Sequence, residues 1–256
     1  MRKSNFSKKP SSNDCRDDYI FALVTGAAHR LGRTLAMALA HQGYAILLHY
    51  HLAAEKARAT ADEIRALNIP VQLAQADLTD PKQIFNLFKF IDTLHHPLGV
   101  LVNSAAIMLH EDVYTLSKED WDRTFALNLD APFMCAQQAA RRMGESGGLI
   151  INITDVGGSR AWSKFPAYAV SKAALESLTR ILAKALAPKI RVNAIAPGLV
   201  LPAEDTSLDE WESLIERLPL RRPASLDEIG TALEFLLNNK YVTGQTIVVD
   251  GGYSLL

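Results

Sequence analysis

The sequence predicts an α/β protein whose seven-stranded parallel sheet is covered by helices on both faces. Short apolar runs alternate with longer segments of helical periodicity along most of the 256 residues. Repeated strand and helix units favour right-handed crossovers and a doubly wound parallel sheet. Hydrophobic residues make up 48% of the chain, which is enough for the core of one globular domain of this length.

Seven apolar runs are too short for helices and are bounded by turn residues, so they are predicted as buried strands. The first of them ends at Thr25-Gly26, and the last ends at Asp250. The predicted strands are residues 20–24, 45–49, 71–75, 100–103, 149–154, 190–196 and 246–250.

The segments between the strands carry apolar residues at helical spacing. Gly43 can end the first helix as a C-cap, and Pro81 suits the first turn of the third. The predicted helices are residues 33–42, 53–68, 81–94, 117–143, 168–186, 208–217 and 226–237.

Several chemically distinctive residues lie at the ends of predicted strands or just after them. Gly26, Asn103, Asp155 and Pro197 each stand at such a place. Because parallel strands end at the same edge of a sheet, where ligands bind in open α/β folds, we expect these residues to converge on one site.

The turn from Thr25 to Gly32 is rich in small residues and joins the first strand to the first helix. Gly26 permits a tight turn, Gly32 permits close packing of the helix, and free N–H groups at the helix start can hold a pyrophosphate. An ordinary strand-to-helix turn has the same pattern, so the loop is a dinucleotide site only in combination with other motifs.

Tyr168 and Lys172 lie four residues apart and therefore share one face of a helix. Asp155 precedes the tyrosine by thirteen residues, and Asn128 lies further back. A tyrosine with a pKa of about 10 is a poor acid-base catalyst at neutral pH, but a neighbouring ammonium favours the phenolate. An exposed amphipathic helix also produces such a pair, so the proton-transfer hypothesis depends on the whole combination.

In order and spacing, these motifs resemble the short-chain dehydrogenase/reductases over residues 19–256. The matching segments are Thr25-Gly26 to Gly32 as cofactor loop, Asp77-Leu78 as adenine-side pair, Asn103-Ser104-Ala105-Ala106 as a variant of Asn-Asn-Ala-Gly, Asn128, Tyr168 with Lys172, and Pro197-Gly198. The resemblance implies a single-domain Rossmann fold for an NADP-binding reductase domain at 19–256.

Where the sequence departs from the usual family pattern, its residues resemble those of pteridine reductases and dihydromonapterin reductases. Asp155 stands where most members carry Ser, and Arg30 stands where most carry Gly. Residues 48–51, Leu-His-Tyr-His, and the chain ending 249–255 point to the same subfamily. This resemblance implies NADPH-dependent reduction of a pterin ring, from a dihydropterin to a tetrahydropterin, or of dihydrofolate.

The resemblance implies four catalytic residues, Asp155, Tyr168, Lys172 and Asn128. Asp155 would accept hydrogen bonds from the pterin or deliver a proton together with Tyr168, and the two groups would titrate as a coupled pair. Lys172 would also bind the nicotinamide ribose, and Asn128 would hold a water that connects Lys172 with solvent. The alternative for Asp155 is a cap or turn residue at a strand end.

The cofactor-binding residues implied are Gly26, His29, Arg30, Leu31, Gly32, His51, Asp77, Leu78, Asn103, Ala105, Tyr168, Lys172, Pro197 and Gly198. NADPH is favoured because residues 47–52, at the end of the second strand, hold no acid that would bind the ribose hydroxyls of NAD. Arg30, with His29 and His51, can meet a 2′-phosphate. Leu52 and Ala53 replace the Arg and Ser of pteridine reductases, which weakens the predicted selectivity.

Arg30, Met108, Asp155 and Tyr168 are the predicted substrate contacts. Ile107-Met108 stands where pteridine reductases place an aromatic residue, and a thioether can still cover a ring with about 0.3–1.5 kcal/mol. Trp162, Phe165 and Trp211 could add an aromatic wall, although each also suits ordinary packing.

Two other functions remain open from the sequence. One is reduction of a carbonyl or quinone, with Asp155 as an isolated replacement. The other is a non-catalytic, dinucleotide-binding redox sensor, which would have no chemical need for Asn128, Tyr168 and Lys172.

Composition and short motifs limit the classes of partner that the protein is expected to have. A net charge of −1 gives no global field for nucleic acid or anionic membrane. Residues 1–18 are predicted to be a flexible tail rather than a secretory signal or membrane span. Two cysteines imply no disulfide framework, and the histidines show no metal-ligand pattern. We expect a cytoplasmic enzyme with a small-molecule substrate, and the resemblance implies a homotetramer.

Overall fold

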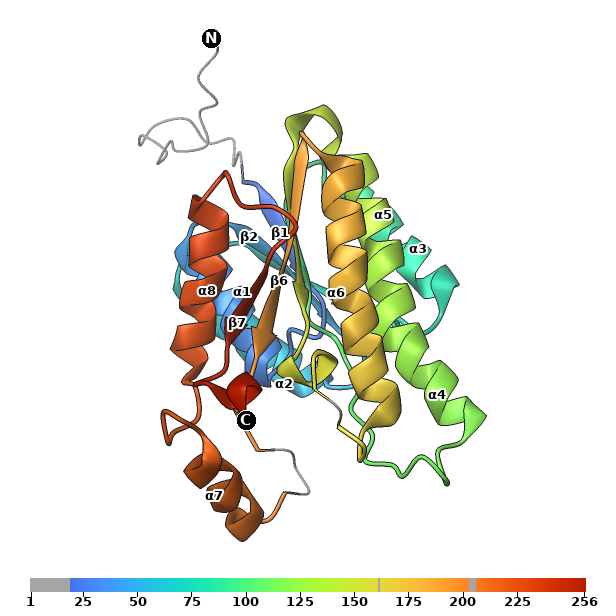
Figure 1. The fold of residues 1–256 in the computed structure, drawn as a ribbon. Helices are drawn as coiled ribbons and strands as arrows, with labels where there is room; N and C mark the ends of the chain where they lie inside the picture. Colours follow the sequence, from blue (N-terminus) through green and yellow to red (C-terminus); the bar gives the residue numbers. More distant parts are fainter. Residues whose placement is uncertain (1–18, 161, 203–205) are drawn as a thin grey trace.

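Seven parallel strands form one sheet in the order β3-β2-β1-β4-β5-β6-β7 (Figure 1). The structure is a computed structural model that describes residues 19–160, 162–202 and 206–256. The predicted tail of residues 1–18 lies outside the described residues. The strand order and the uniformly parallel pairing confirm the predicted doubly wound, seven-stranded fold.

The strands coincide with the predicted apolar runs and differ from them by a few residues at their ends. All of β1 and most of β2 are buried, as expected for a parallel sheet covered on both faces. The strands are β1 Phe21–Val24, β2 Ala45–Tyr50, β3 Val71–Gln75, β4 Leu98–Asn103, β5 Gly148–Ile153, β6 Ile190–Pro197 and β7 Thr246–Val249.

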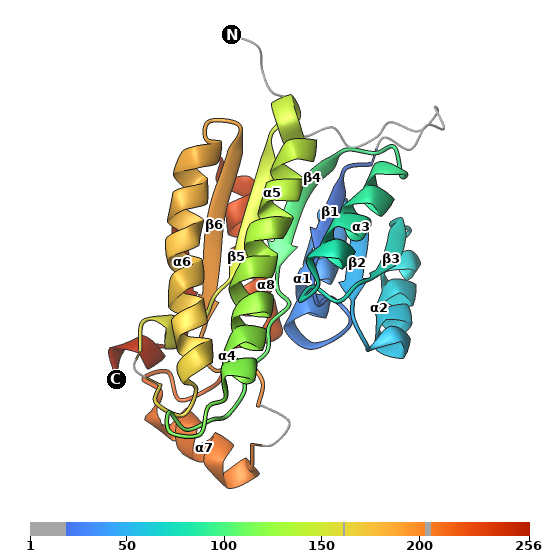
Figure 2. The same cartoon turned by 90° about the vertical axis from the view of Figure 1, so that its right-hand side faces the viewer.

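Helices cover the sheet in two layers, and each layer has its own apolar core (Figure 2). On one face lie α1 Arg30–His41, α2 Ala54–Ala66 and α8 Leu226–Asn238, and on the other lie α3 Pro81–Asp92, α5 Ala131–Met143 and α6 Pro166–Leu186. Helix α7, Leu208–Arg217, has no buried residue and stands apart from both layers, near the carboxyl edge of the sheet (Figure 1).

The helix predicted for residues 117–143 is interrupted by one π-helical turn. Helix α4, Lys118–Phe125, leads into the turn Ala126–Asp130, and α5 follows it. Asn128 lies inside this turn and is fully buried. Such π-bulges frequently occur at functional sites, because the irregular turn re-aims side chains out of the helical register.

Two helices begin earlier than predicted. Helix α1 begins at Arg30 rather than at residue 33, so the glycine loop is shorter. Helix α6 begins at Pro166, two residues before Tyr168. Proline suits this first position because it has no N–H to leave without a partner.

A buried chain of polar side chains fixes α6 against the sheet. The Nδ2 of Asn103 donates to Oδ1 of Asn152 at 2.9 Å, and the Nδ2 of Asn152 donates to Oγ1 of Thr179 at 2.9 Å. All three residues are almost inaccessible to solvent. Satisfied buried networks rigidify a core, and this one connects β4, β5 and α6, the helix that carries Tyr168 and Lys172.

None of the helices in the described ranges is both long enough and apolar enough to cross a lipid bilayer.

Candidate active site

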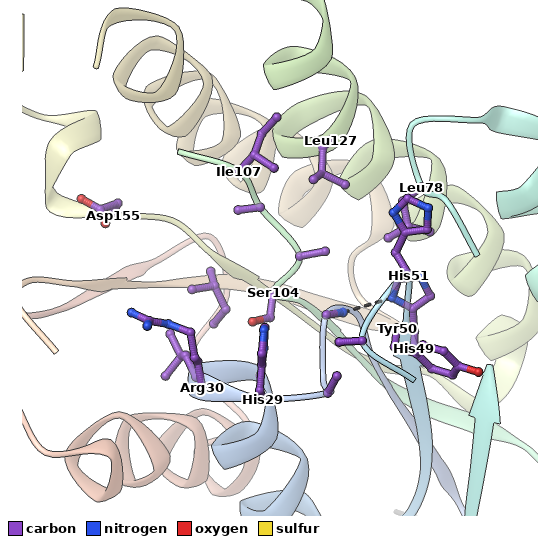
Figure 3. Close-up of a pocket in the computed structure, with 18 of the residues that line it drawn as sticks. His29, Arg30, His49, Tyr50, His51, Leu78, Ser104, Ile107, Leu127 and Asp155 are labelled. Atoms are coloured by element: carbon purple, nitrogen blue, oxygen red, sulfur yellow. Dashed lines mark hydrogen bonds between the residues drawn. The ribbon is translucent and has the colours of Figure 1, made fainter. Parts of the chain in front are cut away.

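A cleft of about 640 Å³ opens at the carboxyl edge of the sheet. Figure 3 shows Asp155 at one end of it and His51 with Leu78 at the other. Most of the predicted site residues line this cleft: Gly26, His29, Arg30, Leu31, Gly32, His51, Asp77, Leu78, Ala105, Asp155, Tyr168, Lys172, Pro197 and Gly198. Of the four residues expected to converge at the strand ends, Gly26, Asp155 and Pro197 line the cleft and Asn103 does not.

Asp155 and Tyr168 form a direct hydrogen bond at one end of the cleft. The Tyr168 hydroxyl donates to Oδ2 of Asp155 at 2.9 Å. The other carboxylate oxygen, Oδ1, accepts from the backbone N–H of Gly157 at 2.7 Å. Asp155 is thus a turn cap through one oxygen, and its second oxygen faces the phenol.

The ammonium group of Lys172 is buried close to the ring of Tyr168. Lys172 is only 3% exposed, and its Nζ donates to the carbonyl of Ile153 at 2.8 Å. Nζ lies 5.5 Å from the centre of the Tyr168 ring. Burial lowers the pKa of Lys172 to about 8, while the nearby Asp155 carboxylate acts in the opposite direction.

The pKa values of Asp155 and Tyr168 are both raised above their ordinary values. Burial raises the pKa of Asp155, against the hydrogen bonds from Gly157 and Tyr168 and the charge of Lys172. Burial, followed by the charge of Asp155, raises the pKa of Tyr168 well above its ordinary value. The structure does not bear out the expected lowering of the tyrosine pKa, because desolvation and the Asp155 carboxylate, which accepts from the hydroxyl at 2.9 Å, both raise it.

Asn128 holds the loop after β4 against α6. Its Oδ1 accepts from the N–H of Ile107 and its Nδ2 donates to the carbonyl of Ile107, both at 2.9 Å. Nδ2 also donates to Oγ of Ser171 at 3.1 Å. Ser171 precedes Lys172, so Asn128 positions the loop relative to the residues that carry the chemistry. The water predicted between Asn128 and Lys172 stays a prediction.

The glycine loop has the close contacts that its sequence requires. Gly26 has a φ of +65°, a value that glycine adopts without strain. A Cβ on Gly32 would lie 2.1 Å from the carbonyl oxygen of Gly26, so a side chain there would displace the loop. The loop leads directly into α1, whose first N–H groups have no helical partner and suit a pyrophosphate.

Arg30 reaches across the cleft. Its backbone is left-handed, with φ +52°, and its guanidinium donates to the carbonyl of Pro202 at 2.7 Å and approaches that of Leu201 at 3.5 Å. In this structure, Arg30 therefore joins the glycine loop to the segment after β6. Its predicted contacts with phosphate and substrate stay predictions.

At the other end of the cleft, the two residues that follow β2, His51 and Leu52, are not acidic. The Nε2 of His51 lies 3.9 Å from Oδ2 of Asp77, and Leu52 is 83% exposed. A free adenosine 2′-hydroxyl would find no carboxylate acceptor from this strand end, whereas the imidazole of His51 offers a donor to a phosphate.

Three predicted residues lie outside the cleft lining. Asn103 is buried behind it in the polar chain with Asn152, and Asn128 acts through its bonds to Ile107. Met108 is 42% exposed, and its neighbour Ile107 lines the cleft instead. Substrate contact through Met108 therefore stays an untested prediction, and Ile107 is the better placed of the two.

Two of the three aromatic residues considered for the substrate wall, Trp162 and Phe165, take part in packing, and Trp211 lies on α7, which has no buried residue. Trp162 touches the Gly157 backbone so closely that a Cβ there would lie 2.6 Å from the ring, and its centre is 6.1 Å from that of Tyr253. Phe165 packs edge-on against His110 with ring centres 5.2 Å apart.

Sequence reasoning missed several cleft residues. His49, Arg123 and Thr154 line it. Thr25, which the sequence placed in the cofactor loop, accepts hydrogen bonds from the N–H groups of Ser104 and Ala105. His49 had a usable signal, because a polar residue inside an apolar strand end needs a partner. Arg123 had none, since an Arg on a helix is ordinarily a surface residue.

No group of three or more His, Cys, Asp or Glu side chains able to hold a metal ion occurs in the part of the chain that the structure describes.

Comparison with known proteins identifies the family. The family model described as Enoyl-(Acyl carrier protein) reductase matches residues 26–254. The chain is 35% identical over 237 residues to 3-oxoacyl-[acyl-carrier-protein] reductase FabG of Staphylococcus aureus, covering 90% of this chain and 96% of that protein.

Solved structures are equally similar. FolM, alternative dihydrofolate reductase 1, from Brucella suis in complex with NADP has a TM-score of 0.88 and 35% identity over 93% of this chain and 96% of its own. A gluconate 5-dehydrogenase from Burkholderia cenocepacia in complex with NADP and tartrate has a TM-score of 0.86 and 30% identity, over 94% of this chain and 97% of its own. The chain therefore belongs to the short-chain dehydrogenase/reductase family and is an oxidoreductase of that family.

Proposed function

We propose that the protein is an NADPH-dependent reductase that converts a dihydropterin, or dihydrofolate, to the tetrahydro form. The observation that carries this proposal is the hydrogen bond of 2.9 Å between Tyr168 and Asp155. A carboxyl group in this place can accept from pterin N–H groups or release a proton, which a serine hydroxyl does poorly. Similarity to the FolM structure, whose name is alternative dihydrofolate reductase, supports the same substrate class.

The cofactor predicted from the sequence, NADP, is confirmed by similar structures that hold it. The cleft of this chain fits such a dinucleotide, because it connects the glycine loop at α1 with His51 at one end and Lys172 at the other. His51 would hold the 2′-phosphate, and Lys172 the nicotinamide ribose. When bound, the dihydronicotinamide supplies the hydride.

The residues of the chain supply the proton. Reduction of a 7,8-dihydropterin adds hydride to C6 and a proton to N5, which consumes the double bond between these atoms. Tyr168 donates the proton to N5, and Lys172 stabilises the tyrosinate that remains. Asp155, whose pKa burial raises, then takes up a proton from solvent and passes it to the tyrosinate along their hydrogen bond. The pair thereby returns to its starting state, and atoms and charge balance over one turnover.

Carbonyl reduction is the second candidate. FabG of Staphylococcus aureus, 35% identical to this chain, is named as a 3-oxoacyl reductase. Against this candidate, an ionised Asp155 would repel the oxyanion that forms from a carbonyl.

The substrate assay separates the candidates. The purified protein is given NADPH with dihydrobiopterin, dihydromonapterin or dihydrofolate, and in parallel with simple ketones, a 3-oxoacyl thioester and quinones. Oxidation of NADPH that depends on a dihydropterin or dihydrofolate is the expected result. Turnover of a carbonyl or quinone with inert pterins would reject the proposal.

The pH dependence of turnover is expected to follow Lys172. Its pKa of about 8 means that the ammonium is present below that pH and lost above it. Since the ammonium stabilises the tyrosinate, kcat should fall as the pH rises through about 8. Steady-state rates between pH 6 and 10, with circular dichroism as a control for folding, test this. A kcat that stays constant to pH 10 would show that the charge on Lys172 does not contribute.

Assembly and location are further proposals. We propose a cytoplasmic homotetramer, and exposed apolar side chains on α5 and α6, including Phe133, Val170 and Ile181, are consistent with contacts between copies. Light scattering in solution gives the mass, and a monomeric mass at micromolar concentration would reject the tetramer.

A further inference from the structure

His49 lies at the end of β2, is 2% exposed, and uses both ring nitrogens. Its Nδ1 accepts from the backbone N–H of Gly26 at 3.1 Å, the bond drawn to its ring in Figure 3. Its Nε2 lies 3.0 Å from the carbonyl oxygen of Ala76. We propose that His49 is a positioning residue for the dinucleotide, which sets the glycine loop and the adenine-side segment at the spacing that NADPH requires.

The two partners determine the state of the ring. A carbonyl oxygen only accepts hydrogen bonds, so Nε2 must carry a proton toward Ala76. A backbone N–H only donates, so Nδ1 must present its lone pair to Gly26. Both bonds exist together only in this neutral tautomer. Burial lowers the pKa of His49 to about 4, so the ring remains neutral at ordinary pH and Gly26 keeps its acceptor.

The ring of His49 makes its contacts just beyond the last paired residues of β1 and β2. The pairing of β1 with β2 ends at Val24 and Leu48, two residues before Gly26. The carbonyl of His49 accepts from Ala27 at 2.8 Å, so backbone and side chain of one residue bind consecutive N–H groups of the loop. Without the ring, the N–H of Gly26 would lose its partner at the start of the loop.

Two parts of the cofactor site therefore bind the ring of His49, and a third follows it on the chain. Gly26 opens the loop that would face the pyrophosphate. Ala76 immediately precedes Asp77 and Leu78, which line the far end of the cleft. His51, the candidate phosphate contact, follows two residues after His49 on the same strand end. A change at His49 should therefore alter dinucleotide affinity, although the ring is hidden behind the backbone of the loop.

Two substitutions separate the two hydrogen bonds. In His49→Asn, the amide oxygen can take the place of Nδ1 and accept from Gly26, but nothing reaches Ala76. In His49→Gln, the amide nitrogen can take the place of Nε2 and donate to Ala76, but the Gly26 N–H loses its acceptor. Both replacements are polar and smaller than imidazole, so each serves as the packing control for the other.

The dissociation constant of NADPH is measured directly, by calorimetry or by cofactor fluorescence, with no pterin present. We expect His49→Gln to weaken binding by about tenfold, which corresponds to about 1.4 kcal/mol. His49→Asn should weaken it clearly less, and thermal unfolding should show similar stability for both variants. Because no substrate is used, failure of the pterin proposal would leave this result unaffected.

Two outcomes would overturn the proposal. Unchanged NADPH affinity in both variants, with reduced stability, would mean that His49 serves the fold alone. Equal weakening in both would mean that the bond to Gly26 is not the one that matters.

The wild-type protein gives an independent test that does not depend on the folding of a variant. Nitrogen-15 NMR of the histidine rings, with His49 assigned from the spectrum of a variant, should show a protonated Nε2 and an unprotonated Nδ1 that do not titrate between pH 5 and 8. A proton on Nδ1 would exclude the bond from Gly26 and reject the proposal.

Discussion

Replacement of Tyr168 by Phe is expected to lower kcat for dihydropterin reduction by about 10²–10⁴-fold, the range for loss of a general acid. The variant removes the only atom that can carry the proton from Asp155 to the substrate in the proposed path. The ring is buried and Phe preserves its shape, so the fold and the binding of NADPH should remain almost unchanged. Single-turnover rates and a separate NADPH titration measure the two effects.

Tyr241→Phe is the matched control, because the Tyr241 side chain is fully exposed. This control should retain wild-type kcat. If Tyr168→Phe kept its rate within about tenfold of the wild type, the loss would fall below the expected range for a general acid, and another group would have to deliver the proton.

Replacement of Asp155 by Ser should reduce kcat/KM for dihydropterin by about 10²-fold or more, a loss typical of a proton-transfer group. Ser cannot hold the second proton of the pair, and its hydroxyl is too short to replace both bonds, to Tyr168 and to Gly157. The cofactor half of the cleft is unaffected, so NADPH affinity should be preserved. A second variant, Asp155→Asn, keeps the shape but removes the charge, and it should lose turnover to a similar degree.

The exposed Asp227 at the start of α8 supplies the control Asp227→Ser, which should behave as wild type. Undiminished pterin turnover in Asp155→Ser would remove the main support for a pterin substrate. A gain in ketone turnover with the same variant would favour the carbonyl candidate, because Ser is a neutral donor for a carbonyl oxygen.

The predicted strands and the convergence of the site followed from local patterns. Buried parallel strands need continuous apolar runs, so β1 and β2 were recognisable in the sequence. Gly26 and Asp155 come just after strands and Pro197 ends one, and the geometry of a parallel sheet brings such residues together without knowledge of distant contacts.

Other features depend on contacts that no local pattern encodes. Arg30 bonds to Pro202, far along the chain, and the periodicity of neither segment predicts this pairing. A strand buried on both faces gives no sign of which neighbour His49 reaches. In the loop after β4, periodicity cannot decide between Ile107 and Met108, because an irregular backbone has no fixed side-chain direction.

The raised pKa of Tyr168 could not be obtained from the sequence either. A Tyr and a Lys one turn apart predict attraction, but the outcome depends on burial and on the 2.9 Å distance to Asp155. Desolvation and a close like charge act in the same direction here and exceed the influence of Lys172. Three-dimensional distances, rather than residue types, decide the sign.

The most direct test of the central claim is transfer of deuterium from NADPH labelled at C4 of the nicotinamide to a 7,8-dihydropterin. Mass spectrometry of the product should show a tetrahydropterin that carries one deuterium at C6, and Tyr168→Phe should form almost none of it. A protein that binds NADPH yet yields no deuterated tetrahydropterin or tetrahydrofolate, while a ketone or quinone is labelled instead, would contradict the proposed function.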